Sequence, residues 1–134
     1  QMLNGCIGGL VAITAEPLMP SPLAAILIGA VGGVIVVYGT KLLFSLKIDD
    51  VVGAIPAHLF AGIWGTLAVP ITNPDTSFGA QLLGVISINV FVFFVALIVW
   101  SIMKATIGIR LSKEGETKGT DVTETGVIAY AIRD

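Results

Sequence analysis

The feature that most constrains this chain is a series of long runs with almost no charge. About 20 consecutive apolar residues are needed to cross the roughly 30 Å hydrocarbon core of a bilayer. Three runs reach this length, over residues 21–44, 51–72 and 78–109, and a shorter apolar run covers 2–15. Backbone groups in lipid must pair within the chain, so these runs are expected to be helices. The sequence therefore predicts an all-α membrane protein with three complete spans and, at 2–15, part of a fourth.

The positions of the basic residues predict an orientation. All seven lie either near the end of the run 21–44 and just after it, as Lys41 and Lys47, or from Lys104 onward. Cytoplasmic loops carry an excess of lysine and arginine, so segment 41–50 and the tail 110–134 are expected to be cytoplasmic. No basic patch interleaved with aromatic residues indicates a nucleic-acid partner.

The only histidine, His58, lies in the apolar stretch 50-DVVGAIPAHLFAGIWG-65. It is eight positions after Asp50, which is about 12 Å along a helix. An ionisable residue at that depth in a membrane is a functional hypothesis by default. Pro56 is expected to loosen or kink the helix just before it.

A regular helix would place His58 on a face of small side chains. At 3.6 residues per turn its neighbours on that face are Ala54, Ala61 or Gly62, and Gly65. The opposite face would carry the bulkier Ile55, Leu59, Phe60, Ile63 and Leu67. Such a small-residue face either packs tightly or borders a narrow passage.

Two interpretations of His58 stay open from the residues alone. One is a core imidazole hydrogen-bonded to a neighbouring helix, and the other is a group beside a path for a small polar solute or a relayed proton. A neutral imidazole offers one donor and one acceptor, which suits a small neutral molecule better than a bare cation. No metal-site spacing, cofactor motif or nucleophile–base arrangement is present, so neither a metal, a cofactor nor an enzyme activity is predicted.

Other polar residues have a structural and a functional interpretation each. Asp49 and Asp50 would cap the start of the helix, or attract a cation at the cytoplasmic mouth of a passage. Asn4 and Thr14 would form hydrogen bonds between helices, or line the passage together with Ala54 and Gly62.

Small residues predict close packing of the run 21–44. Ala25, Gly29 and Gly33 recur at four-residue spacing beside a second row of Ala24 and Gly32, a pattern that lets helix backbones approach.

The tail differs from the apolar runs in composition. Segment 112–126 is charged and would be disordered by itself, whereas 127-VIAYAI-132 is apolar and suggests docking.

Four segments together resemble the C-terminal portion of the ammonium transporter family, the Amt/Mep/Rh group. They are 4-NGCIGGLVAITA-15, 47-KIDDVVGAIPAHLFAGIWGTLAV-69, 107-IGIRLS-112 and 119-GTDVTETGVIAY-130. The resemblance implies the last four helices of an eleven-helix, inverted-repeat transporter that is a homotrimer in a bacterial inner membrane. It implies that His58 is the second of two histidines facing each other in a narrow ammonia pore.

The resemblance also implies a role for the tail, which in this family packs beneath a neighbouring subunit and is a site of control by PII-type signalling proteins. Asp121, Thr123 and Tyr130 are the candidate regulatory residues, and Thr123 matches a threonine that is phosphorylated in plant relatives. Two departures stand out. Leu59 and Phe60 follow the histidine where glycine is usual, and 121-DVTETGV-127 lacks the usual histidine and acid. The alternative function is a non-transporting membrane scaffold whose tail binds a cytoplasmic regulator.

Overall fold

The computed structural model describes residues 2–18 and 20–128, which are helical wherever they are regular and include no strand. The chain divides into two compact units, Gln1–Val90 and Phe91–Asp134. Within the described residues, three helical stretches are long and apolar enough to cross a membrane: Pro22–Ser45, Ile55–Thr72 and Phe78–Thr106. The chain is therefore an all-α membrane protein, as its apolar runs predict.

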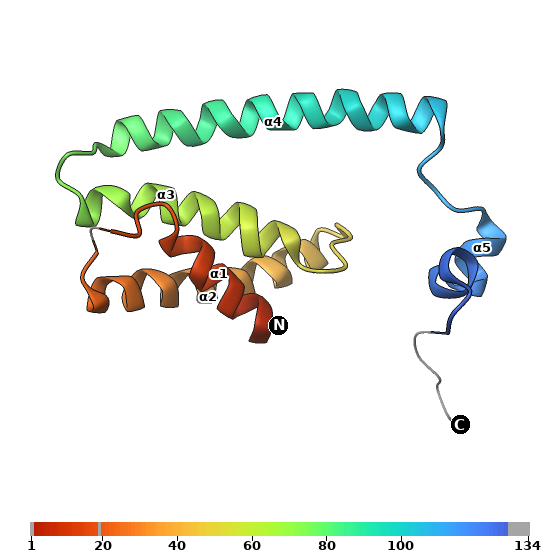
Figure 1. Ribbon diagram of the computed structural model, residues 1–134, viewed down its shortest axis with the longest axis horizontal. Coiled ribbons are helices and arrows are strands. Elements are labelled where there is room, and N and C mark those ends of the chain that lie inside the picture. Colours follow the sequence, from red (N-terminus) through yellow and green to blue (C-terminus); the bar gives the residue numbers. More distant parts are fainter. Residues whose placement is uncertain (1, 19, 129–134) are drawn as a thin grey trace. The chain divides into compact units, whose positions relative to one another are not determined.

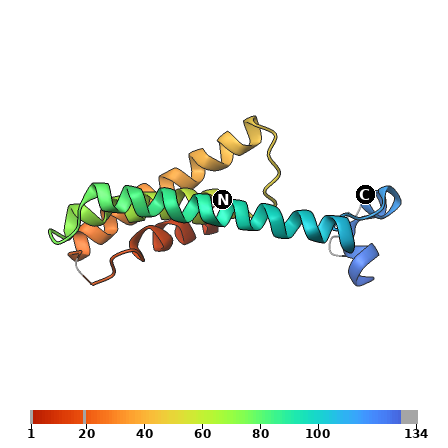
Figure 2. The ribbon, with the colours of Figure 1, turned by 90° about the horizontal axis from the view of Figure 1, so that it is seen from above.

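The first unit is built on three helices packed side by side: α1 (Met2–Ile13), α2 (Pro22–Ser45) and α3 (Ala61–Thr72) (Figures 1 and 2). A π-helical turn, η1 (Ile55–Phe60), leads directly into α3 and packs on α1 and α2 as well. The helical part of the predicted run 51–72 thus begins at Ile55, because a turn occupies the residues before it. Gly53 in that turn has φ +72°, a conformation that a helix does not continue through.

Glycines determine how closely α1 and α2 approach. A methyl group placed on Gly9 would lie 3.0 Å from the carbonyl oxygen of Gly29, and one on Gly32 would lie 2.8 Å from that of Gly8. Neither position can accept a side chain without moving a backbone. The close packing predicted from the small residues of 21–44 is confirmed, and α1 is the partner helix.

Helix α3 closes the bundle with small side chains and one long-range hydrogen bond. A methyl group on Gly65 of α3 would overlap the backbone of Ala12 of α1, so α3 and α1 are also in close contact. The indole Nε1 of Trp64 donates a 3.0 Å hydrogen bond to the carbonyl oxygen of Ile28. Most of the buried apolar side chains form two clusters, one of Ala12, Ile28 and Ala68 and one of Val36, Ala57 and Ala61.

Helix α4 (Phe78–Thr106) begins in the first unit and continues into the second. Its 29 residues give about 43 Å of helix at 1.5 Å per residue, and none of them is buried. Since its exposed side chains are almost all apolar, α4 has the character of a helix surrounded by lipid or by other membrane helices.

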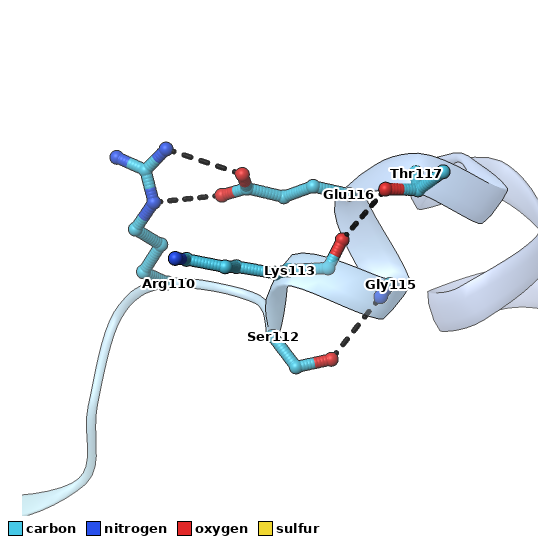
Figure 3. Close-up of polar contacts among 6 residues, drawn as sticks. All are labelled: Arg110, Ser112, Lys113, Gly115, Glu116 and Thr117. Carbon is cyan, nitrogen blue, oxygen red and sulfur yellow. Dashed lines mark hydrogen bonds and ion pairs between the residues drawn. The ribbon is translucent and has the colours of Figure 1, made fainter.

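The tail in the second unit contains two short helices, α5 (Lys113–Lys118) and η2 (Asp121–Thr125). The prediction that 112–126 is disordered is therefore wrong. Ser112 Oγ accepts a 3.1 Å hydrogen bond from Gly115 N, and Arg110 forms an ion pair with Glu116 at 2.7 Å (Figure 3). These local contacts order a segment that composition alone would leave unfolded.

Candidate functional site

The histidine lies on a helical turn with one extra residue. In η1 the Ala61 N–H donates to the carbonyl of Pro56, five positions earlier, where an α-helix would bond four positions earlier. The loosening expected from Pro56 is thus confirmed, and it takes the form of a π-turn. Turns of this kind are found mostly as single insertions within α-helices, frequently at functional sites.

The π-turn changes the direction in which His58 points. A π-turn winds by roughly 80° per residue rather than about 100°, so over the three steps from His58 to Ala61 the difference is about 60°. Of the residues predicted to share a face with His58, Gly62 does line the same groove, whereas the prediction is wrong for Ala61 and Gly65 for this reason. Ala61 and Gly65 are buried in the helix bundle, whereas His58 is exposed.

His58 opens into a groove of about 270 Å³ within the first unit. The groove is lined by Leu59, Gly62 and Ile63 beside the histidine, so His58 is not opposite Leu59 and Ile63 as a regular helix would place it. Within the described part of the chain the imidazole has no hydrogen-bond partner, so both of its nitrogens are available to a molecule in the groove. The interpretation as a core imidazole bonded to a neighbouring helix is not what the first unit shows.

Three polar side chains line the same groove, and the sequence analysis missed them: Thr66 on α3, and Gln81 and Asn89 on the first half of α4. Asn89 Nδ2 is occupied by a 2.7 Å hydrogen bond to Val85 O, within its own helix. The signal that would have found the pair on α4 is their separation of eight residues, two helical turns, in an otherwise apolar helix.

Asp50 caps the start of the turn that carries the histidine. Its Oδ1 accepts from Ala54 N at 2.8 Å and its Oδ2 accepts from Ile55 N at 2.9 Å. Of the two interpretations given for Asp50, capping is therefore the one with a contact to support it. Asp49 is exposed and lines a different groove of about 300 Å³ that also includes Lys47 and Thr40.

The remaining candidate lining residues lie elsewhere. Asn4 Nδ2 donates to the carbonyl oxygen of Val52 at 2.7 Å, and Thr14 Oγ1 donates to Val11 O at 2.7 Å within α1. Ala54 is exposed but is not among the residues that line the groove. Of the four candidates, the structure brings only Gly62 together with His58.

The model of the ammonium transporter family matches residues 1–130, which is nearly the whole chain. This chain belongs to the ammonium transporter family. It is 42% identical over 126 residues to a Synechocystis protein named "Putative ammonium transporter sll1017", an alignment that covers 92% of the chain. It is 36% identical over 148 residues to ammonium transporter Amt2 of Archaeoglobus fulgidus, and 33% identical over 147 residues to the ammonium transporter of Bacillus subtilis.

This family member spans only part of its relatives. The alignments cover 28%, 31% and 36% of the lengths of the Synechocystis, Archaeoglobus and Bacillus proteins, but 92%, 95% and 96% of this chain.

Two of the candidate regulatory residues in the tail of this ammonium transporter family member, Asp121 and Thr123, lie on η2. Asp121 is the first residue of η2, and Thr123 Oγ1 donates a 3.2 Å hydrogen bond to Gly115 O of α5. Tyr130 lies outside the described residues.

The hydrogen bond and the negative charge of Glu116 raise the pKa of Arg110 above its ordinary value. Within 2–18 and 20–128, no group of three or more metal-ligating side chains occurs.

Proposed function

We propose that this chain is the part of an ammonium transporter that carries one of two pore histidines, and that ammonia passes the imidazole of His58. The observation that carries the proposal is the position of that imidazole. It is the one titratable side chain between Asp50 and Asp75, it lies in a chain that the ammonium transporter family model matches over residues 1–130, and it lines a groove of the first unit.

The chemistry of the groove favours a small molecule that both donates and accepts hydrogen bonds. Next to His58, Gly62 leaves room at the groove wall, and Thr66 adds a hydroxyl group. A bare ammonium ion in such an apolar passage would be costly, whereas ammonia is neutral. His58 is thus suited to pass ammonia directly or to exchange a proton with ammonium at the entrance of the narrow part.

The complete transporter would be a homotrimer in a bacterial inner membrane, with the segment 41–50 and the tail on the cytoplasmic side. This orientation is supported by the positions of the lysines and arginines, which all lie either in 41–50 or from Lys104, in the last turn of α4, onward. Asp49 and Asp50 would then lie at the cytoplasmic mouth. The tail from Lys113 to Thr125 would contact a neighbouring subunit or a PII-type signalling protein, with Asp121 and Thr123 on the helix that makes the contact.

The test is uptake of ammonium or methylammonium by the complete protein with His58 replaced. His58→Ala is expected to lower uptake by about tenfold or more at an unchanged amount of protein in the membrane. His58→Gln, which keeps a hydrogen-bond donor and acceptor but cannot carry a proton, separates two roles. Partial uptake by His58→Gln favours hydrogen bonding to ammonia, and uptake as low as that of His58→Ala favours proton exchange.

The test also distinguishes the alternative function. If His58→Ala takes up substrate as well as the unchanged protein, His58 is a packing residue and the transport role loses its support. A non-transporting scaffold predicts, in addition, that deletion of Lys118–Asp134 abolishes binding of a regulator while no substrate uptake is measurable in either form.

A further inference from the structure

We propose that Gly39 and Phe60 are positioning residues for His58: the contact between them fixes the rotation of η1 and thereby turns the imidazole into the groove. This inference rests on the proposed function, because it concerns how the pore histidine is held. Neither residue lines the groove, so any effect on transport must act through the histidine-bearing turn.

The first step is the contact itself. Gly39 is buried on α2, and a methyl group at this position would lie 2.7 Å from Phe60 Cδ2 and 2.9 Å from Pro56 Cβ. The backbone of α2 therefore touches η1 near both of its ends, at its second residue and at its last. Pro56 is fully buried and has a rigid ring, so it cannot move aside as a longer side chain would.

The second step is the position of His58 between these two contacts. The histidine is two residues from Pro56 and two residues from Phe60. At roughly 80–100° per residue, two residues are about half a revolution of the turn. Because Pro56 and Phe60 are held against α2, His58 is directed away from α2, to the side where the groove lies.

The third step is specific to this sequence. Two bulky residues, Leu59 and Phe60, follow the histidine in this chain. On the facing helix, Gly39 has no side chain and so accommodates the aromatic ring of Phe60. A tight fit of this kind has few alternative arrangements, so it determines the angle of the turn as well as its stability.

The experiment compares two glycine substitutions on α2 in the complete transporter. In Gly39→Ala the new methyl group meets Phe60 and Pro56. In the matched control, Gly33→Ala, it would lie 3.3 Å from the carbonyl oxygen of Gly5, against α1 and away from η1. Gly39→Ala is expected to lower methylammonium uptake per assembled protein by about tenfold or more, and Gly33→Ala by less than about twofold. Equal uptake by the two variants would overturn the inference.

A second substitution tests the contact directly. Replacing Phe60 by alanine removes the ring that the new methyl group meets, so Gly39→Ala/Phe60→Ala is expected to recover at least part of the uptake lost in Gly39→Ala. Absence of any recovery would contradict the proposed pairing. If Gly39→Ala does not assemble, Phe60→Ala alone carries the test. It removes the contact of η1 with Gly39 and is expected to lower uptake severalfold at normal assembly. Unchanged uptake would overturn the inference.

A third comparison separates positioning from general packing. On a His58→Ala background, Gly39→Ala is expected to cost less than about twofold in uptake, because the side chain that it positions is already absent. The full tenfold loss on that background would show that Gly39 acts by another route. If His58→Ala leaves uptake unchanged, the proposed function fails. If His58→Ala impairs uptake but Gly39→Ala and Phe60→Ala do not, only the positioning role fails.

Discussion

Asn4 and Val52 form a hydrogen bond across 48 positions of the sequence, with Asn4 Nδ2 donating to the carbonyl oxygen of Val52 at 2.7 Å. Val52 lies in the turn that precedes η1, next to Gly53 with its φ of +72°, so its carbonyl is not part of the helical hydrogen-bond pattern. The amide of Asn4 supplies a donor to it. A side chain of α1 thus holds the turn that leads into the histidine-bearing helix.

Replacement of Asn4 by alanine is expected to destabilise the complete protein by about 1 kcal/mol, the usual net contribution of an intramolecular hydrogen bond, since the Val52 carbonyl loses this donor. Thermal unfolding in detergent measures the change. Ser45→Ala is the control, because Ser45 Oγ bonds only to Leu42 O of its own exposed turn and its loss is expected to be close to neutral. Equal unfolding temperatures for Asn4→Ala and Ser45→Ala would contradict the role given to Asn4.

Asp50→Ala is expected to lower the free energy of unfolding by about 1–2 kcal/mol, because two backbone N–H groups at the start of η1 lose their acceptor. Asp50→Asn keeps one acceptor oxygen and turns an NH2 group towards the other N–H, so an intermediate or similar loss is expected. The neighbouring Asp49→Asn also removes one negative charge, but at an exposed position, and serves as the reference. A reference variant as unstable as Asp50→Asn would show that net charge, rather than capping, is responsible.

The α1–α2 contact is expected to tolerate a methyl group at one glycine but not at another. In Gly32→Ala the new Cβ would lie 2.7 Å from Ala12 Cβ and 2.8 Å from Gly8 O, whereas in Gly5→Ala the nearest atom of a facing helix would be 3.9 Å away. Overpacking of this kind costs about 1–3 kcal/mol, so Gly32→Ala should unfold at a clearly lower temperature than Gly5→Ala. The reverse order would mean that the two helices are not in this register.

The ion pair of Arg110 and Glu116 is expected to hold the start of α5 in a salt-dependent way. Its partner raises the pKa of Arg110, so the guanidinium contribution is complete at neutral pH and is lost only as the pH rises through that elevated value. Both side chains are well exposed, so added salt should weaken the pair and accelerate amide exchange in α5. In Glu116→Gln the salt dependence should disappear, while in Glu124→Gln, an exposed residue of η2, it should persist.

The sequence predicts the positions of side chains in the site only where the helix keeps its regular period of 3.6 residues per turn. The pattern of residues in a regular helix was enough to predict three features: the apolar runs, the small-residue contact that α2 makes with α1, and the importance of Pro56. The direction of His58 does not, because one extra residue in η1 rotates every side chain before Ala61 away from the regular projection. The groove residues Thr66, Gln81 and Asn89 were missed for a related reason, since residues on different helices come together only when the helices are placed.

The sequence by itself determined that this chain is a helical membrane protein, because the cost of burying polar backbone in lipid leaves few alternatives to long apolar helices. Its family follows from the sequence as well, through the match of the ammonium transporter family model to residues 1–130. Only the tertiary structure decided where the π-turn falls and which side chains hold it. Contacts such as Gly39 with Phe60 and Asn4 with Val52 join residues far apart in the chain. Their energies depend on distances of a few ångströms that no local pattern encodes.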